Sequence, residues 1–304
     1  MVKMQRWKSK LQVRGVIMKK VVKFGGSSLA NAEQFQKVGD IIRSDESRRY
    51  VVPSAPGKRF DDDIKVTDML YGCYDAASKG EDITEKINAI KARYYEIIKG
   101  LGLSLSLEEE FKKIDEDFRA QAGIQYAASR GEFLNGKIMA AYLGYDFVDA
   151  ASVIRFDKAG NLEAEETNKL LSKKLSKSQH AVIPGFYGAC ADGTVKTFSR
   201  GGSDVTGSLV AKAIHADIYE NWTDVSGFLV TDPRIVHNPE PIEAITYREL
   251  RELSYMGATV LHEDAIFPVR KEGIPINIRN TNSPEDKGTL IVESTCKKPK
   301  FTIT

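Results

Sequence analysis

The stretch that decides the fold is "KKVVKFGGSSLANAEQFQKVGD", Lys19 to Asp40. It begins with an apolar run, continues through Lys23, and reaches two glycines followed by two serines. After Asn31, apolar residues recur at intervals of three and four, which is typical of a helix with one buried face. These residues are Phe35, Val38, Ile41 and Ile42. The stretch therefore predicts a buried strand over residues 20–24, a glycine-rich turn, and a helix capped by Asn31.

The glycine-rich turn itself suggests a ligand. Such a turn between a strand and a helix can point backbone N–H groups into one concavity, where the helix dipole adds positive potential. Lys23 adds a full charge beside Gly25, Gly26 and Ser27. These features predict a phosphate site, and a tight turn beside a solvated lysine is the simpler alternative. The spacing matches neither GxxxxGK[ST] nor GxGxxG, which excludes the P-loop and the dinucleotide-binding motif.

Strand and helix signals alternate along the rest of the chain, which indicates an α/β fold with a largely parallel central sheet. The predicted strands are 20–24, 50–53, 146–149, 181–184, 218–222 and 274–279. Further predicted helices are 169–175, 206–214, 247–256 and 264–271. Between about residues 65 and 130 helical patterns replace the strand signals, so this stretch is predicted to be a helical insertion within one domain. A capping box of Ser106 and Glu109 opens one of its helices.

Composition and charge exclude several classes of function. The 304 residues include 44 Lys or Arg and 42 Asp or Glu, and the net charge of +2 favours neither nucleic acid nor a membrane surface as a partner. No apolar run approaches the roughly 18 residues of a membrane-spanning helix. The three cysteines are widely spaced and form no CxxC pair. This pattern indicates a reduced, cytoplasmic protein without a disulfide framework or a zinc site.

The first 17 residues contain five Lys or Arg and no acid. A transit peptide can have this composition, but the stretch lacks a serine-rich run, and Met18 can itself begin the chain. We therefore expect residues 1–17 to form a flexible extension that comes from an upstream start or an added segment.

A second polar stretch, SRGGSD, runs from Ser199 to Asp204 and opens a helix after a glycine-punctuated hairpin. Arg200 offers a planar fork of donors that suits a carboxylate. The two glycines allow the backbone to approach a ligand closely. Ser203 or Asp204 could instead serve only as the N-cap of the helix. From these residues alone, a structural role and a functional role stay open.

Two more stretches place polar groups where ligands commonly bind. Thr223 and Asp224 follow the predicted strand 218–222, at the edge where open α/β sheets bind ligands, or they form a simple turn. A second turn, TDPRIV, presents Arg234. In the stretch SRGEF, Glu132 is an acid at a helix start, which is either a site residue or a surface acid favoured by the helix dipole.

Taken together, KFGGSS, SRGE, TFSRGGSD and WTDVSGFLVTDPRIV resemble the aspartate kinase family of the amino acid kinase superfamily. The resemblance runs from about Lys19 to Leu290 and includes GATVLHEDAI and NTNSPEDKGTLI. It implies the carbamate kinase-like, three-layer fold. It also implies ATP-dependent phosphorylation of the side-chain carboxylate of L-aspartate to 4-phospho-L-aspartate, the entry step to lysine, threonine and methionine. Kinases of this type are commonly homodimers.

The resemblance also assigns catalytic and nucleotide-binding roles. Lys23 matches the lysine that reaches the transferring phosphate, and Asp204 matches the acid that orients this lysine. The matches to the backbone cradle are Gly25, Gly26 and Ser27. The matches on the nucleotide side are Thr223, Asp224, Leu229, Arg234 and Asn282. ATP is expected to arrive with Mg²⁺ held mainly by phosphate oxygens and water, without a dedicated metal site in the protein.

On the substrate side, the resemblance assigns four residues. Glu132 matches the acid that takes the substrate ammonium, and Arg200 matches the arginine that clamps a carboxylate of aspartate. Ser54 and Thr67 match the serine and threonine of the loop after the second strand.

The sequence departs from the family pattern at several positions. Lys196 and Ser199 are substitutions in the usual TTLGRGGSD, and GATVLHE lacks the lysine and the proline of GAKVLHP. The segment Asn280–Ser283 lacks the lysine that some members carry before the final strand, so Arg234 is the nearest substitute for a second cation on the phosphates. An insertion also precedes Thr67.

The resemblance implies a catalytic domain over residues 18–292 and a tail over 293–304, where the paired ACT regulatory domains of the family usually begin. We therefore expect either a shortened catalytic form or a natural form without feedback control, insensitive to lysine.

Three other functions stay open. A kinase for another carboxylate such as glutamate shares the fold, and assays with alternative acceptors distinguish it. A nucleotide sensor without activity is disfavoured by the intact Lys23 and Asp204. A dehydrogenase is disfavoured by the missing GxGxxG.

Overall fold

The structure is a computed structural model that describes residues 18–199, 201–231, 235–237, 239–255, 261 and 263–294. Its centre is an eight-stranded sheet with the strand order β3-β4-β2-β1-β7-β9-β10-β8. The strands of this sheet are β1 (Lys20–Phe24), β2 (Arg48–Pro53), β3 (Asp146–Phe147), β4 (Ala181–Val182), β7 (Ile218–Thr223), β8 (Ala244–Thr246), β9 (Ile276–Asn280) and β10 (Thr289–Val292). Neighbouring strands are parallel except β9 and β10, so the prediction of an α/β fold with a mainly parallel sheet is confirmed.

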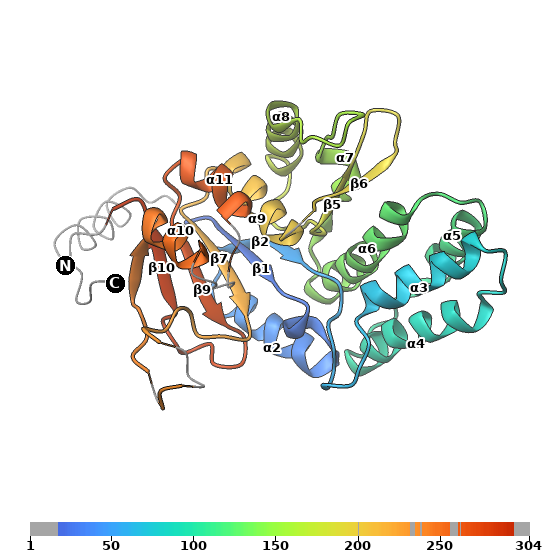
Figure 1. The fold of residues 1–304 in the computed structure, drawn as a ribbon, viewed down its shortest axis with the longest axis horizontal. Coiled ribbons are helices and arrows are strands. Elements are labelled where there is room, and N and C mark those ends of the chain that lie inside the picture. The colour runs from blue at the N-terminus through green and yellow to red at the C-terminus, as the bar shows by residue number, and fades with distance from the viewer. Residues whose placement is uncertain are drawn as a thin grey trace.

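Helices cover both faces of the sheet and complete three layers (Figure 1). One apolar core contains residues of α7 (Ala150–Val153), α8 (Ala164–Leu175), α9 (Gly202–Ala213), α10 (Tyr247–Tyr255) and α11 (Glu263–Lys271). The other contains residues of α2 (Ala32–Arg43), α3 (Val66–Ser78), α4 (Thr84–Gly100), α5 (Glu108–Arg119) and α6 (Ile124–Leu143). A separate hairpin pairs β5 (Tyr187–Ala189) with β6 (Val195–Thr197).

The opening strand β1 shows why an apolar run predicts a buried strand. Successive side chains of a strand point to opposite faces, so Val21 enters one core and Val22 the other. The chain then turns through the short 3₁₀ helix η1 (Ser27–Leu29) into α2. The predicted cap of α2 is confirmed, because the Asn31 side chain accepts a hydrogen bond from the Gln34 amide at 2.9 Å.

Some local predictions differ from the structure. The capping box is wrong: α5 begins at Glu108, and the Ser106 hydroxyl accepts a bond from the Glu108 amide at 3.3 Å instead of the Glu109 amide. The strands β8 and β10 were not predicted. They are short, and each buries a single isoleucine in the core, Ile245 or Ile291, so neither has a long apolar pattern.

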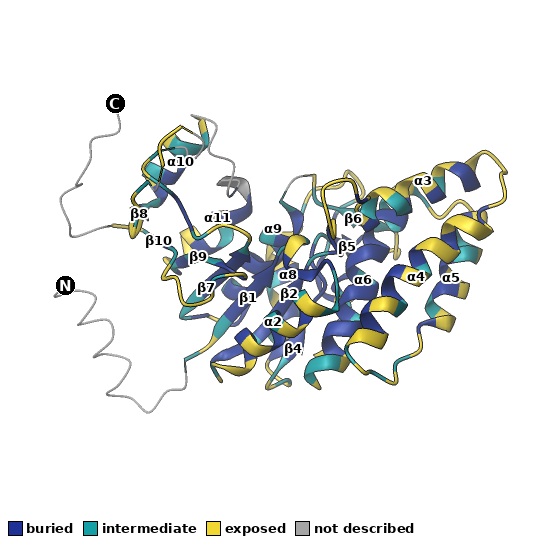
Figure 2. Ribbon diagram, turned by 90° about the horizontal axis from the view of Figure 1, so that it is seen from below, coloured by how far each residue is buried: buried dark blue, intermediate teal, exposed yellow. Residues whose placement is uncertain are grey.

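The segment predicted as a helical insertion forms α3, α4 and α5, at the end of the molecule opposite β8 and β10 (Figure 1). These helices expose their outer faces and bury the faces that pack on α6 (Figure 2). Tyr94 on α4 is fully buried and donates a hydrogen bond to the Gly131 carbonyl of α6 at 2.8 Å. Within the described part of the chain, no helix has both the length and the apolar character needed to cross a membrane.

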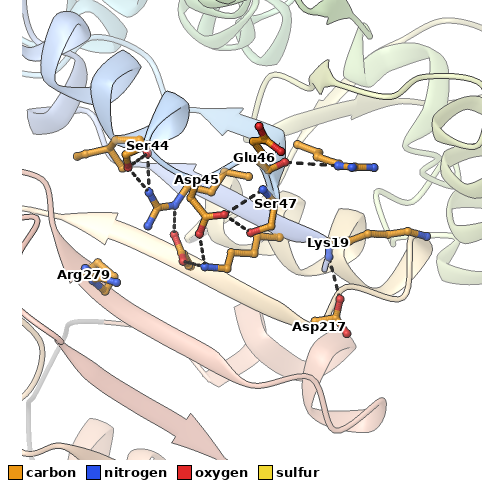
Figure 3. A network of polar contacts seen from close by, with 12 residues as sticks. Lys19, Ser44, Asp45, Glu46, Ser47, Asp217 and Arg279 are labelled. Atoms are coloured by element: carbon orange, nitrogen blue, oxygen red, sulfur yellow. Dashed lines mark hydrogen bonds and ion pairs between the residues drawn. The ribbon is translucent and has the colours of Figure 1, made fainter. Parts of the chain in front are cut away.

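A buried charge network ties the amino ends of the central strands to the end of α2. Glu220 on β7 is 1% exposed and contacts Arg48 of β2 at 2.8 Å and Lys20 of β1 at 3.0 Å. Lys20 also contacts Asp45 at 2.7 Å, and Figure 3 shows Asp45 beside Ser47 in this network. Although burial would raise the pKa of Glu220, Arg48 and Lys20 lower this pKa below its usual value. The network is therefore an ionised, mutually compensated cluster.

Candidate active site

The carboxyl ends of four parallel strands meet at one edge of the sheet, where open α/β folds bind ligands. The loops that leave β1, β2, β7 and β9 are joined there by backbone hydrogen bonds. These bonds run from Ser54 to the Phe24 carbonyl at 3.0 Å, from Gly25 to the Trp222 carbonyl at 3.0 Å, and from Thr281 to the Thr223 carbonyl at 2.9 Å. The structure therefore brings segments far apart in the sequence into a single site.

A buried ion pair lies at the centre of this edge. The Lys23 ammonium, at the end of β1, lies 2.7 Å from a carboxylate oxygen of Asp204 in the first turn of α9. The Asn221 amide donates to the same oxygen at 2.8 Å, and its own oxygen lies 3.5 Å from the Lys23 ammonium. The parallel register places Lys23 directly opposite Asn221. Because an ammonium has three donors, these two acceptors leave one donor of Lys23 for a ligand.

The carboxylate of Asp204 is not the cap of α9. The N-cap position is Gly201, whose φ of 55° lies in the left-handed region that glycine adopts without strain. The alternative that Asp204 merely caps its helix is thereby excluded, because its side chain faces Lys23 and Asn221.

The turn after β1 presents two backbone amides. The Gly25 amide is engaged by Trp222, and the amides of Ser28 and Leu29 close the 3₁₀ turn. In the described part of the chain, the amides of Gly26 and Ser27 have no hydrogen-bond partner. A phosphate cradle at this turn would thus be formed by the amides of Gly26 and Ser27, with Gly25 shaping the backbone.

The loop after β2 lies directly on this turn. The Gly57 amide donates to the Gly26 carbonyl at 2.8 Å. A Cβ atom on Gly57 would lie 2.6 Å from the Gly26 carbonyl carbon, so a side chain there would push the two loops apart. Sequence reasoning missed Gly57, although a glycine after a buried strand is a signal of close backbone approach.

The helix α6 supplies the acidic side of the site. Glu132 is 6% exposed, and its Oε2 has no hydrogen-bond partner among the described residues. Burial raises the pKa of Glu132 to about 8, although hydrogen bonds from the Ala55 amide and its own amide favour the charged form. The preceding residue, Gly131, faces Ala55 and Thr67: an added Cβ would lie 2.8 Å from the Ala55 side chain and 3.9 Å from the Thr67 hydroxyl.

Asn135, one turn after Glu132, was missed by sequence reasoning. It is fully buried, and its side-chain amide donates to the Ser54 carbonyl at 2.6 Å. The available signal was its position three residues after Glu132, since residues at that spacing share a face of a helix. Ser54 and Thr67 therefore lie close to the turn of α6 that carries Glu132, and Asn135 holds the loop at Ser54.

The predicted nucleotide-side residues follow β7 and β9. The Thr223 hydroxyl donates to Asp224 at 3.2 Å at the exposed end of β7. Asn282 accepts a bond from Gln34 of α2 at 3.1 Å. Leu229 lies further along, where it forms an isolated bridge with Pro241. Ser28 and Thr281 share a hydroxyl hydrogen bond of 2.8 Å, which connects the phosphate turn to the loop after β9.

Several predicted features lie outside the described residues. Arg200 and Arg234, the two arginines assigned to the carboxylate and the nucleotide, are among them. Most of the GATVLHE segment lies outside as well.

Comparisons with known proteins agree with this arrangement. The crystal structure of the aspartate kinase of Clostridium acetobutylicum is 53% identical, with a TM-score of 0.88 over 92% of this chain and 64% of that chain. Aspartokinase 3 of Bacillus subtilis is 40% identical over 289 residues, which cover 90% of this chain and 63% of the relative. Aspartokinase III of Escherichia coli, solved in complex with aspartate and ADP, is 28% identical, with a TM-score of 0.78 over 91% of this chain and 65% of that chain.

The chain thus spans a little under two thirds of the length of these relatives. The Amino acid kinase family matches residues 18–280, which include every helix and strand that carries the site, from β1 to β9. The three-layer fold agrees with this match. The chain belongs to the amino acid kinase family.

Proposed function

We propose that this protein is an aspartate kinase, which transfers the γ-phosphoryl group of ATP to the side-chain carboxylate of L-aspartate. The products are ADP and 4-phospho-L-aspartate, and the reaction opens the synthesis of lysine, threonine and methionine. The observation that carries the proposal is the buried pair of Lys23 and Asp204, 2.7 Å apart. It lies at the same sheet edge as the unpartnered amides of Gly26 and Ser27.

The proposed transfer needs positioning and charge compensation more than covalent help from the protein. A carboxylate oxygen of aspartate attacks the γ-phosphorus while the bond to the β–γ bridging oxygen breaks, and ADP leaves with that electron pair. Lys23 compensates the charge on the transferring group. Asp204 and Asn221 hold its ammonium in place, and the amides of Gly26 and Ser27 bind phosphate oxygens.

The loop after β2 and helix α6, beside Lys23 and Asp204, would recognise the amino acid. Glu132 would pair with the substrate ammonium, and Ser54 and Thr67 would contact the substrate from the facing loop. Arg200 would hold a carboxylate. A buried carboxylate with an unpartnered oxygen favours a free ammonium over an acetylated amine, because only the ammonium compensates the buried charge. The relative from Escherichia coli was solved with both aspartate and ADP, which supports this choice of substrates.

We further propose that ATP binds together with Mg²⁺. In the described part of the chain, no group of three or more His, Cys, Asp or Glu side chains could hold a metal ion. The cation would be held mainly by phosphate oxygens and water, as is common for Mg²⁺ at nucleotide sites. A homodimer in the cytoplasm is the proposed working form.

The test is a coupled assay of aspartate-dependent ADP formation with wild-type protein, Lys23→Ala and Lys37→Ala. Lys37 is a lysine of α2 whose one ion-pair partner in the described part of the chain is Glu33, so its replacement controls for the loss of a charge. We expect Lys23→Ala to lower kcat by roughly 10²- to 10³-fold, as deletion of a preorganised charge does. Turnover with glutamate or acetylglutamate in place of aspartate would contradict the proposed substrate.

A further inference from the structure

Arg93 is a buried arginine of the helical segment α3–α5. The residue itself has no part in the site described above. It belongs to α4, whose outer face is exposed, yet the residue itself is 4% exposed. A guanidinium is costly to remove from water unless its donors are paired. The partners of Arg93 therefore indicate what it holds in place.

The partners of Arg93 are the two loops that carry the site. One terminal nitrogen donates to Asp63 at 2.6 Å. The other donates to the Gly57 carbonyl at 3.0 Å and, over a longer distance of 3.4 Å, to the Ala30 carbonyl. Ala30 ends the phosphate turn, and Gly57 belongs to the loop that begins at Ser54. One planar fork thus joins both loops to α4.

Asp63 compensates the charge of Arg93. Its side chain is 8% exposed and also accepts bonds from the Arg59 amide and guanidinium at 2.9 to 3.0 Å. Hydrogen bonds from Arg59 hold the pKa of Asp63 well below its usual range, so the carboxylate is charged at neutral pH. Arg59 reaches back to Glu96 of α4 at 3.0 Å, which gives the loop a second attachment to the same helix.

The two loops held by Arg93 also touch each other. Gly57 lies on Gly26 through a hydrogen bond of 2.8 Å, and the Ser54 amide is bonded to the Phe24 carbonyl at 3.0 Å. A shift of Gly57 would therefore move the Gly26 amide and the Ser54 side of the site relative to each other. Since phosphoryl transfer depends on the placement of both substrates, such a shift would act on the reaction.

We propose that Arg93 is a positioning residue, which sets the separation between the phosphate turn and the substrate loop from the helical segment. The inference rests on the proposed function. The polar contacts of Arg93 are with Ala30, Gly57 and Asp63, and it would act on the reaction through these residues. The segment α3–α5 thereby takes part in building the site as well as packing on α6.

Arg48 offers a matched control. It is also a buried arginine, 7% exposed, which pairs with the acid Glu220 and donates to the Ile41 carbonyl and the Ser44 hydroxyl. Its guanidinium also lies over the ring of Trp222. Its polar contacts join β2 and β7 to the end of α2, and among the described residues none of its polar partners belongs to the two loops. Loss of either arginine removes a buried ion pair, but only loss of Arg93 releases the loops.

The experiment compares Arg93→Met, Arg93→Lys and Arg48→Met. For each variant, the thermal midpoint, kcat, both KM values and the Kd of ADP are measured well below the midpoint. We expect Arg93→Met to lower kcat/KM for aspartate roughly 10- to 100-fold. The Kd of ADP should rise as well. Arg93→Lys should recover only part of the loss, because an ammonium lacks the planar fork that reaches three acceptors. Arg48→Met should lower the midpoint and leave kcat, KM and Kd near those of wild type.

Equal kinetic constants in Arg93→Met and Arg48→Met, at a similar loss of midpoint, would overturn the inference and make Arg93 merely structural. If Arg93→Met does not fold, kcat, both KM values and the Kd of ADP are measured for Arg93→Lys and Asp63→Asn instead. Constants equal to those of Arg48→Met would again make Arg93 merely structural. If the wild-type chain shows no aspartate-dependent ADP formation, the proposed function fails, and the Kd of ADP in the same variants still decides the role of Arg93.

Discussion

Two lysines of the same strand show how partners, and not burial, separate a structural charge from a functional one. Lys20 and Lys23 lie three residues apart on β1, and their side chains are 16% and 11% exposed. Lys20 contacts two carboxylates, Asp45 and Glu220. Lys23 contacts one carboxylate and one neutral amide, at the sheet edge where backbone amides stay unpartnered. A cation surrounded by acids has no capacity for an anion, whereas a cation with a single acid can still attract one.

Removing the shared acid of the structural network should have the largest effect. Glu220→Gln would leave Arg48 and Lys20 buried beside a neutral amide, which typically costs about 3–5 kcal/mol of stability. We expect a strongly lowered free energy of unfolding in urea. Asp45→Asn is the control, because Asp45 is more exposed and its one cation partner among the described residues is Lys20. A Glu220→Gln variant as stable as wild type would mean that the network does not hold the strands.

Replacing Lys23 should lower activity, whereas replacing Lys20 should lower stability. Lys23→Met should lower kcat by roughly 10²- to 10³-fold, which corresponds to about 3–4 kcal/mol of transition-state stabilisation. Lys20→Met should lower the thermal midpoint and leave kcat nearly unchanged, because its partners lie at the other end of the strand. Equal loss of kcat in both variants would contradict the assignment of Lys23 as functional and Lys20 as structural.

Replacing Asp204, the acid that holds Lys23, should lower kcat less than replacing Lys23 does. Asp204→Asn keeps the size of the side chain and removes the charge that orients the ammonium, so we expect a decrease in kcat of roughly 10- to 100-fold. Steady-state assays with ATP and aspartate measure it. Asp40→Asn, on the exposed face of α2, serves as the control for loss of an acid. Unchanged turnover in Asp204→Asn would show that Asn221 alone is enough to place Lys23.

Glu132 extends the comparison to an acid that has no ion-pair partner among the described residues, and the test is the dependence of stability on pH. Because burial raises the pKa of Glu132 from 4.5 to about 8, the folded chain keeps this proton over a range in which the unfolded chain releases it. The stability from Glu132 is fully present below pH 4.5 and is lost as the pH rises through about 8. Within that window, wild type should lose about 1.4 kcal/mol per pH unit relative to Glu132→Gln.

The measurement is the free energy of unfolding of both proteins at several pH values between 5 and 8. Parallel curves would contradict the assignment of a raised pKa. A second readout is calorimetry of aspartate binding near neutral pH in buffers of different ionisation enthalpy. If the substrate ammonium pairs with Glu132, binding should release a proton, and Glu132→Gln should abolish this release.

Local sequence patterns determined much of the architecture. The strand, turn and helix from Lys19 to Asp40 were predicted with their bounds nearly correct, since an apolar run, two glycines and an Asn cap act over a few residues. The alternation of elements indicated a mainly parallel sheet. The motifs around Lys23 and Asp204 indicated where the candidate site lies, because glycines and charges at a strand end and a helix start are local signals. The prediction that Glu132 stands at a helix start is wrong: it lies in the middle of α6, which begins eight residues earlier at Ile124.

Only the tertiary structure decided which of these residues meet. Asn221 faces Lys23 across a parallel pair of strands, 198 residues away in the chain, and no local pattern encodes that register. No local pattern distinguishes Arg93 from the other charges of α4, and folding buries it against Gly57 and Ala30. Lys20 and Lys23 have different charge partners only because β2, β7 and α9 pack around them. The physical reason is that burial and charge pairing depend on contacts between distant segments. These contacts form when helices pack on both faces of the sheet and complete its two cores.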